Sequence, residues 1–278
     1  PTLSVVLTAT RELSGRREGE TSILVASGGA VARRGDAPVA SETIELRAEP
    51  APGADPAARR SIGRLVTRDP TVVASPVEGG AVELRASGGL EYLYDEVGER
   101  VTEARGVTVA VTGTDALTAR AATVRDFVPE AVSFVAEGDV AFENASGSGA
   151  AEYVEVAGRT RASFAGSPDR PARYELPGGW LRALAIERDG EKVSAGGDVQ
   201  AELESAGRSH AFRAHWADLV RSEVAAAAGE PPRERFDLAA GGDVQAELTE
   251  GTSTLELSAD RVDAAGVLGP GETADEEL

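Results

Sequence analysis

The chain has 278 residues, of which 41% are hydrophobic and 27% are charged, a balance typical of a folded globular protein. It contains no cysteine and only two histidines, His210 and His215, which excludes thiol catalysis, disulfide frameworks, cysteine-ligated metals and a three-histidine metal site. The formal net charge is −19 and the arginines are scattered, so we expect no nucleic-acid partner.

Short segments in which apolar and polar residues alternate recur along the chain, a pattern typical of half-buried strands. In chain order the predicted strands cover residues 2–10, 22–26, 43–47, 82–85, 91–94, 106–111, 116–124, 131–136, 140–143, 153–156, 192–195, 199–203, 210–216, 235–240, 244–248 and 254–262. Residues 214–228 could instead form a helix on propensity, and both alternatives stay open. Loops are expected at 50–60, 146–149, 167–171 and 229–233, and an acidic tail at 269–278. So many short strands with so little helical periodicity predict an all-β protein.

An internal repeat is the most informative feature of the sequence. The nonapeptide Ala-Gly-Gly-Asp-Val-Gln-Ala-Glu-Leu occurs at 195–203 and again at 240–248, and looser copies occur at 27–31, 78–82 and 136–140. A Gly-Gly or Gly-Asp pair between strands supplies positive φ for a turn or a sharp bend, so each copy predicts a strand, a corner and a strand. With their flanking strands the copies define five imperfect units of one domain at 1–268, near residues 22–47, 73–95, 131–156, 192–216 and 235–262.

The repeat resembles a known family. A strand, then Ala-x-Gly-(Asp/Asn)-Val-x-hydrophobic, then a strand ending in Ala-Asp-Arg-Val resembles the OstA-like periplasmic lipopolysaccharide-transport proteins. The best match is 240–262, which Ala259-Asp260-Arg261-Val262 closes, and a second is 79–111. The resemblance implies an elongated V-shaped β-jelly roll, or β-taco, of stacked antiparallel strands with two facing sheets. It also implies an apolar interior that shields acyl chains, and end-to-end pairing through exposed edge strands.

The alternation suggests which side chains face that interior. Many inward positions are alanine, and an interior that its own side chains do not fill suits alkyl chains, at about 0.8 kcal/mol per buried methylene. The predicted lipid-groove lining comprises Val82, Leu84, Val140, Phe142, Val199, Leu203, Phe212, Trp216, Val244 and Leu248. Phe212 and Trp216 are predicted to share a strand face, at i and i+4. The same small side chains could equally pack a thin solid core, and that alternative stays open.

No residue pattern in the chain supports catalysis. Asp139, Asp198 and Asp243 each follow a corner glycine, but one carboxylate per corner falls short of the six to eight oxygens that calcium takes, so a turn role is favoured. His210 and His215 differ in parity and are expected on opposite strand faces. Nucleophile-elbow, phosphate-loop and His-Glu-x-x-His motifs do not occur in the sequence. We expect no enzymatic activity, no cofactor and no bound metal.

These observations predict a non-enzymatic carrier or bridge component for a lipopolysaccharide-like lipid. The chain begins at Pro1 and contains no methionine, so we expect a processed product, exported to the periplasm or cell envelope after removal of a signal or anchor. The expected partners are lipid or lipopolysaccharide, and like-folded envelope proteins or a second copy paired through edge strands. Two alternatives remain: a structural β-repeat module of a surface layer, adhesin or filament without cargo, and a carbohydrate-active β-helix.

Overall fold

In a computed structural model the protein is all-β: its described residues form 20 strands, and every pairing among them is antiparallel. The structure describes residues 5–33, 37–50, 61–94, 98–113, 116–144, 147–176, 179–205, 208–224, 233–250 and 253–268. The described residues contain strands and no helix, which confirms the all-β prediction. The antiparallel pairing makes the β-helix alternative wrong, because neighbouring coils of such a helix pair in parallel. No helix capable of spanning a membrane is found among these residues.

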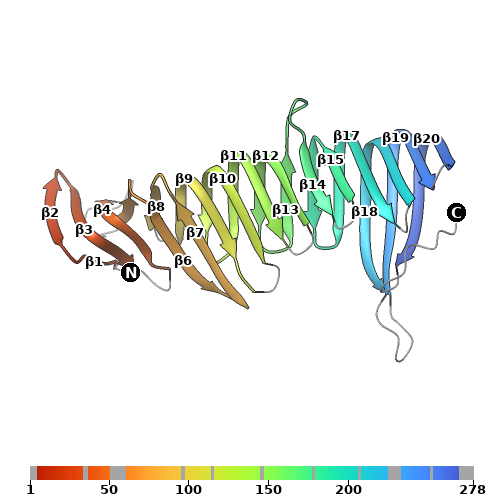
Figure 1. Ribbon diagram of the computed structural model, residues 1–278. Helices are drawn as coiled ribbons and strands as arrows, with labels where there is room; N and C mark the ends of the chain where they lie inside the picture. Colours follow the sequence, from red (N-terminus) through yellow and green to blue (C-terminus); the bar gives the residue numbers. More distant parts are fainter. Residues whose placement is uncertain are drawn as a thin grey trace. The chain divides into compact units, whose positions relative to one another are not determined.

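The chain forms two compact units: Pro1–Ala145 with Glu155–Arg159, and Ser146–Val154 with Thr160–Leu278. The strands of unit 1 are β1 (Val6–Thr8), β2 (Glu12–Glu18), β3 (Thr21–Arg33), β4 (Val39–Pro50), β5 (Ser61–Val66), β6 (Thr71–Val77), β7 (Gly80–Ala86), β8 (Leu90–Tyr94), β9 (Glu99–Val111), β10 (Leu117–Val128) and β11 (Ser133–Asn144) (Figure 1). β4 pairs with β5 and β6, β5 with β8, β6 with β7, and β9 with both β7 and β8. This circuit closes into a small six-stranded barrel, and β3 and β10 continue the pairing outside it.

Unit 2 ends in four long strands. Its strands are the first part of β12 (Gly147–Ala157), then β13 (Arg161–Ala165), β14 (Ala172–Leu176), β15 (Gly179–Ala183), β16 (Ala185–Asp189), β17 (Lys192–Ser205), β18 (Arg208–Val224), β19 (Arg233–Glu250) and β20 (Ser253–Leu268). The first half of β17 pairs with β16 and its second half pairs with β15. In the same way the first half of β9 pairs with β8 and its second half pairs with β7. β17 to β20 then pair in chain order and lie side by side in Figure 1. β18 is a strand through Val224, which decides against a helix there; residues 225–228 lie outside the described part.

The repeated glycines sit at corners inside single long strands. The register of pairing shifts across residues 27–30, 196–199 and 241–244, and Gly28, Gly197 and Gly242 have positive φ. Asp139, Asp198 and Asp243 also have φ near +50°, which supports their predicted turn role. The copy at 78–82 is different, because Val77 pairs with Gly80 across a hairpin turn between β6 and β7. The prediction of a corner in that copy was wrong, because a glycine pair can form either a hairpin turn or a corner within one strand.

Glycine is required at these corners because the neighbouring strand crosses closely. A Cβ on Gly242, at φ +76°, would lie 2.8 Å from the Cβ of His215. A Cβ on Gly197, also at φ +76°, would lie 2.9 Å from the Cβ of Leu184. Real Cβ atoms do not approach this closely, and L-residues rarely adopt this backbone conformation. The nonapeptide repeat therefore encodes a bend over which the side chain of the adjacent strand can pass.

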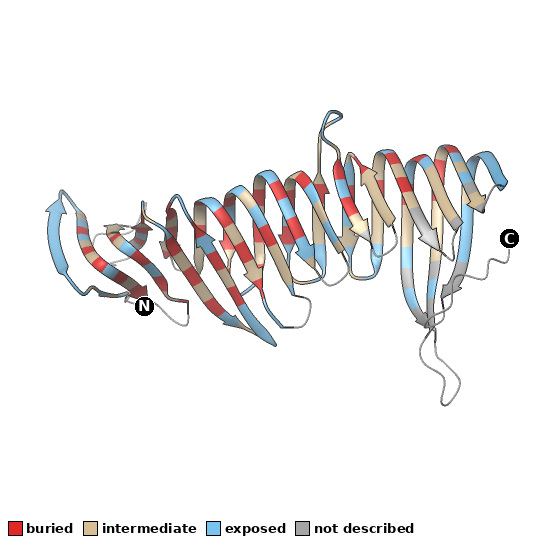
Figure 2. Ribbon diagram, in the orientation of Figure 1, coloured by how far each residue is buried: buried red, intermediate tan, exposed pale blue. Residues whose placement is uncertain are grey.

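The interior of unit 1 is closely filled. Tyr92 and Tyr94 are fully buried with ring centroids 4.7 Å apart, and Phe127 and Phe134 are buried with centroids 6.3 Å apart. β9 passes from pairing with β8 to pairing with β7 around Gly106, its corner, which has positive φ. Beyond this corner its inward residues stay buried, with Val107, Val109 and Val111 each at most 3% exposed. Bands of buried residues run along β6 to β11 in Figure 2, whereas β18 to β20 are mostly intermediate or exposed.

Candidate functional site

The buried face of β17–β20 is the feature that distinguishes unit 2. We give this name to the side on which Ala195, Ala217 and Ala240 lie directly opposite one another, and call the other side the polar face. These alanines, beside the corner, are 7%, 5% and 1% exposed. The next row on the same face, Val193, Leu219 and Leu238, is only half-buried. Burial therefore falls within two residues of the corner, and apolar side chains are left partly in contact with water.

The segments on the other side of the corner behave in the same way. Val199 and Val244 are buried beside the corner. Farther along the same face, Phe212 lies opposite Ala246, and both residues are half-buried. In β20, Leu255 and Leu257 continue this face and are 60% and 49% exposed. An apolar face that loses its cover in this way can bind an alkyl chain, because each methylene removed from water contributes about 0.8 kcal/mol.

The predicted lining residues divide between the two units. Val82, Leu84, Val140 and Phe142 lie in the packed interior of unit 1, each at most 4% exposed. Val199 and Val244 lie buried beside corners of unit 2, and Phe212 lies on the half-buried part of the face. The side chains of Leu203 and Leu248 lie outside the described part. Leu219 and Leu238 were missed, although Ala217-Asp218-Leu219 alternates and would have indicated Leu219 once that segment is taken as a strand.

Trp216 is not on the face of Phe212. Ala214 and Ala217 are both buried, whereas His215 and Trp216 between them are exposed, Trp216 by 38%. The indole covers Gly241, since a Cβ there would meet its ring at 2.7 Å. The corner adds an outward residue to the alternation, so the prediction that Phe212 and Trp216 share a face was wrong. His215 is exposed at the corner, whereas His210 has the parity of Phe212 and Ala214, so the opposite faces expected for the two histidines are found.

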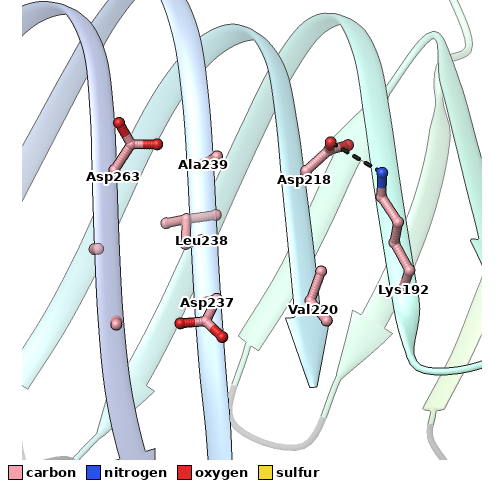
Figure 3. Close-up of a pocket in the computed structure, with 9 residues that line it drawn as sticks. Lys192, Asp218, Val220, Asp237, Leu238, Ala239 and Asp263 are labelled. Carbon is pink, nitrogen blue, oxygen red and sulfur yellow. Dashed lines mark ion pairs between the residues drawn. The ribbon is translucent and has the colours of Figure 1, made fainter. Parts of the chain in front are cut away.

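A shallow hollow of about 410 Å³ lies on the polar face of β17–β20, and its lining also includes Leu238 and Ala264, which the pairing places on the buried face. Figure 3 shows Asp218, Asp237 and Asp263 around it, with the Lys192 ammonium 3.1 Å from an oxygen of Asp218. A hydrogen bond from Ser194, and Lys192 beside it, lower the pKa of Asp218. Arg261, 2.8 Å away, lowers the pKa of Asp263, and Arg235 pairs with Asp237 at the same distance.

Each carboxylate in the hollow thus has a cation beside it. No group of three metal-ligating side chains occurs anywhere in the described ranges. The hollow is therefore a salt-bridged surface, where exposed pairs of this kind contribute little to stability.

Fold and site together define an all-β antiparallel protein with one filled unit and one partly uncovered apolar face. Comparison with family models, curated proteins and solved structures finds no match for the chain.

Proposed function

We propose that the protein is a non-enzymatic carrier of lipopolysaccharide-like lipid, and that the acyl chains lie on the buried face of β17–β20. The observation that carries the proposal is the half-buried row Val193, Leu219 and Leu238, which follows a fully buried row of alanines. A globular core normally buries leucines of this kind. An acyl chain along the row would complete their burial.

The proposal includes the finer architecture, a V-shaped β-jelly roll with two facing sheets. Its support is that long strands bend at glycine corners and pair as separate segments on either side, as β9 and β17 do in their own units. The resemblance of 240–262 to OstA-like lipopolysaccharide-transport proteins supports the same fold and cargo. With it we propose the periplasm or cell envelope as the location, and like-folded envelope proteins or a second copy as partners of the end strands β2 and β20.

The test begins with extraction of the purified protein and mass spectrometry of the lipids it retains. Delipidated protein is then titrated with a fluorescent fatty acid. Leu219→Asp places a charge on the buried face, and we expect it to weaken binding at least about tenfold, since burying an unpaired charge is costly. Val220→Asp is the matched control, because Val220 is the next residue of β18 but is 38% exposed on the polar face; its affinity should change less than about twofold.

Circular dichroism shows whether each variant remains folded. Recovery of no amphiphile from the wild-type protein together with no saturable fatty-acid binding would rule the carrier out. Equal losses in the two folded variants would place binding elsewhere than on the buried face.

One alternative has an observation in its favour: a structural β-repeat module without cargo. The interior of unit 1 is filled by its own side chains, with Val82, Leu84, Tyr92 and Tyr94 all 0% exposed. A module built only to be rigid needs no more than this. The lipid extraction separates the two functions, since a structural module retains no specific amphiphile.

A further inference from the structure

The outer edge of β20 has the chemistry of a strand that pairs with its own copy. Among the described residues β20 pairs only with β19, so its other edge presents unpaired backbone donors and acceptors. Leu255 and Leu257 are 60% and 49% exposed beside that edge. Exposed edges with apolar residues pair readily with another strand unless charge or proline blocks them, and residues 253–268 contain no proline.

The β20 sequence is complementary to itself when two copies run antiparallel. Consider a twofold axis that passes between residues 260 and 261. It places Asp260 opposite Arg261 of a second copy, twice by symmetry, and Ser258 opposite Asp263. On the buried face it places Ala259 opposite Val262, and Leu257 opposite Ala264. Opposite charges meet and apolar residues meet apolar residues, which is the pattern that stabilises cross-strand pairs.

The corner geometry fits the same axis. In β20 the buried-face positions nearest the corner are Ala259 and Val262, opposite Val244 and Ala240. They are three residues apart, and the twofold axis puts Ala259 of each copy opposite Val262 of the other. Unit 1 already contains a pair of strands of this kind. The register between β9 and β10 does not shift from the pair Leu117 and Val111 to the pair Phe127 and Val101. Two strands can therefore turn the corner together without a bulge.

We infer that the protein forms a closed, twofold-symmetric dimer through antiparallel β20–β20 pairing. The inference rests on the edge pairing proposed above and names its partner, a second copy, and its symmetry; it does not depend on the lipid cargo. An interface of one edge with itself closes after two copies, whereas a contact between β20 and β2 of the next copy would grow into filaments.

Sedimentation of delipidated protein over a range of concentrations is the test, at physiological salt so that the net charge of −19 is screened. We expect a monomer–dimer equilibrium with no larger species. Leu257→Lys should abolish the dimer, since it puts an ammonium among apolar residues at the edge. The matched control is Leu13→Lys in β2, where Leu13 is 59% exposed; it should leave the dimer unchanged. Growth beyond dimers, suppressed by both variants, would instead show β20–β2 contacts.

Charge exchange tests the register. Asp260→Arg alone and Arg261→Asp alone should each weaken dimerisation about tenfold, because symmetry doubles every unfavourable pair. The double variant Asp260→Arg/Arg261→Asp should restore it, since each new arginine again faces an aspartate. A monomer at every concentration, or no rescue, would overturn the inference. Binding of the fluorescent fatty acid is measured on the same delipidated samples, so failure of the dimer and failure of the carrier function are seen separately.

Discussion

Unit 1 and unit 2 are built from the same kind of bent strand but differ in what occupies the space beside it. In unit 1 the large side chains Tyr92, Tyr94, Phe127 and Phe134 fill the interior. In β17–β20 the equivalent layer begins with alanines and continues with half-buried valine and leucine. Corners and pairing thus determine the fold, whereas the size of the inward side chains determines whether an interior is sealed.

The largest expected effect tests this difference directly. Leu84→Ala removes a fully buried side chain from unit 1 and should lower the free energy of unfolding by about 3 kcal/mol, through lost burial and the cavity left behind. Leu238→Ala in unit 2 should lower it by about 1 kcal/mol, because Leu238 is only half-buried in the wild-type protein. Denaturation followed by circular dichroism covers both units, and fluorescence follows unit 2 alone, because both tryptophans, Trp180 and Trp216, lie there. Equal losses would mean that the two interiors are equally packed.

The next effect concerns what the units share, their corners. Gly138→Ala in unit 1 and Gly242→Ala in unit 2 should each cost about 2 kcal/mol, since both glycines have φ +76° and their added Cβ would lie 2.9 Å or less from a side chain of the next strand. Gly190→Ala is the control: its φ is +60° but nothing lies within 4 Å of the added Cβ, so about 1 kcal/mol is expected. Thermal denaturation of the three variants gives the comparison. A corner variant that loses no more stability than Gly190→Ala would show that the close approach of the neighbouring strand does not require glycine at the corner.

The sequence predicted many of the strands and most of the corners because both leave local signals: period-two alternation for the strand, and Gly-Gly-Asp for positive φ. Strands β2, β5 and β13 to β16 were not among the predicted strands. It did not predict which interior is sealed, because that depends on which rows the pairing brings together. Val82 and Val199 belong to similar repeats, yet Val82 lies in the filled unit, whereas the row beyond Val199 contains the half-buried Phe212 and Ala246. Trp216 was assigned to the wrong face because the prediction assumed a regular strand. The corner places two outward residues, His215 and Trp216, between the buried Ala214 and Ala217. The copy at 78–82 was misplaced because a hairpin and a corner use the same glycines.

The smallest expected effect concerns the polar face of unit 2. The folded-state pKa of Asp218 is lowered below its ordinary 3.8 by Ser194 and Lys192, so the ionised form contributes stability above that pH and loses it as the pH falls through the lowered value. Because the side chain is 39% exposed, Asp218→Asn should cost no more than about 0.5 kcal/mol at pH 7. The variant and the wild-type protein should converge in stability toward pH 3 when unfolding is followed by tryptophan fluorescence. A constant difference from pH 7 to pH 3 would show that the carboxylate is not stabilised.

The central claim is that acyl chains occupy unit 2 and not unit 1, and covalent mapping tests it most directly. A fatty acid that carries a photoreactive diazirine near the end of its chain is bound, irradiated and located by peptide mass spectrometry. Label on peptides from 192–265, reduced by Leu219→Asp and competed by unlabelled fatty acid, is the predicted result. Saturable label on peptides from 61–111, or label that excess fatty acid does not displace, would contradict it.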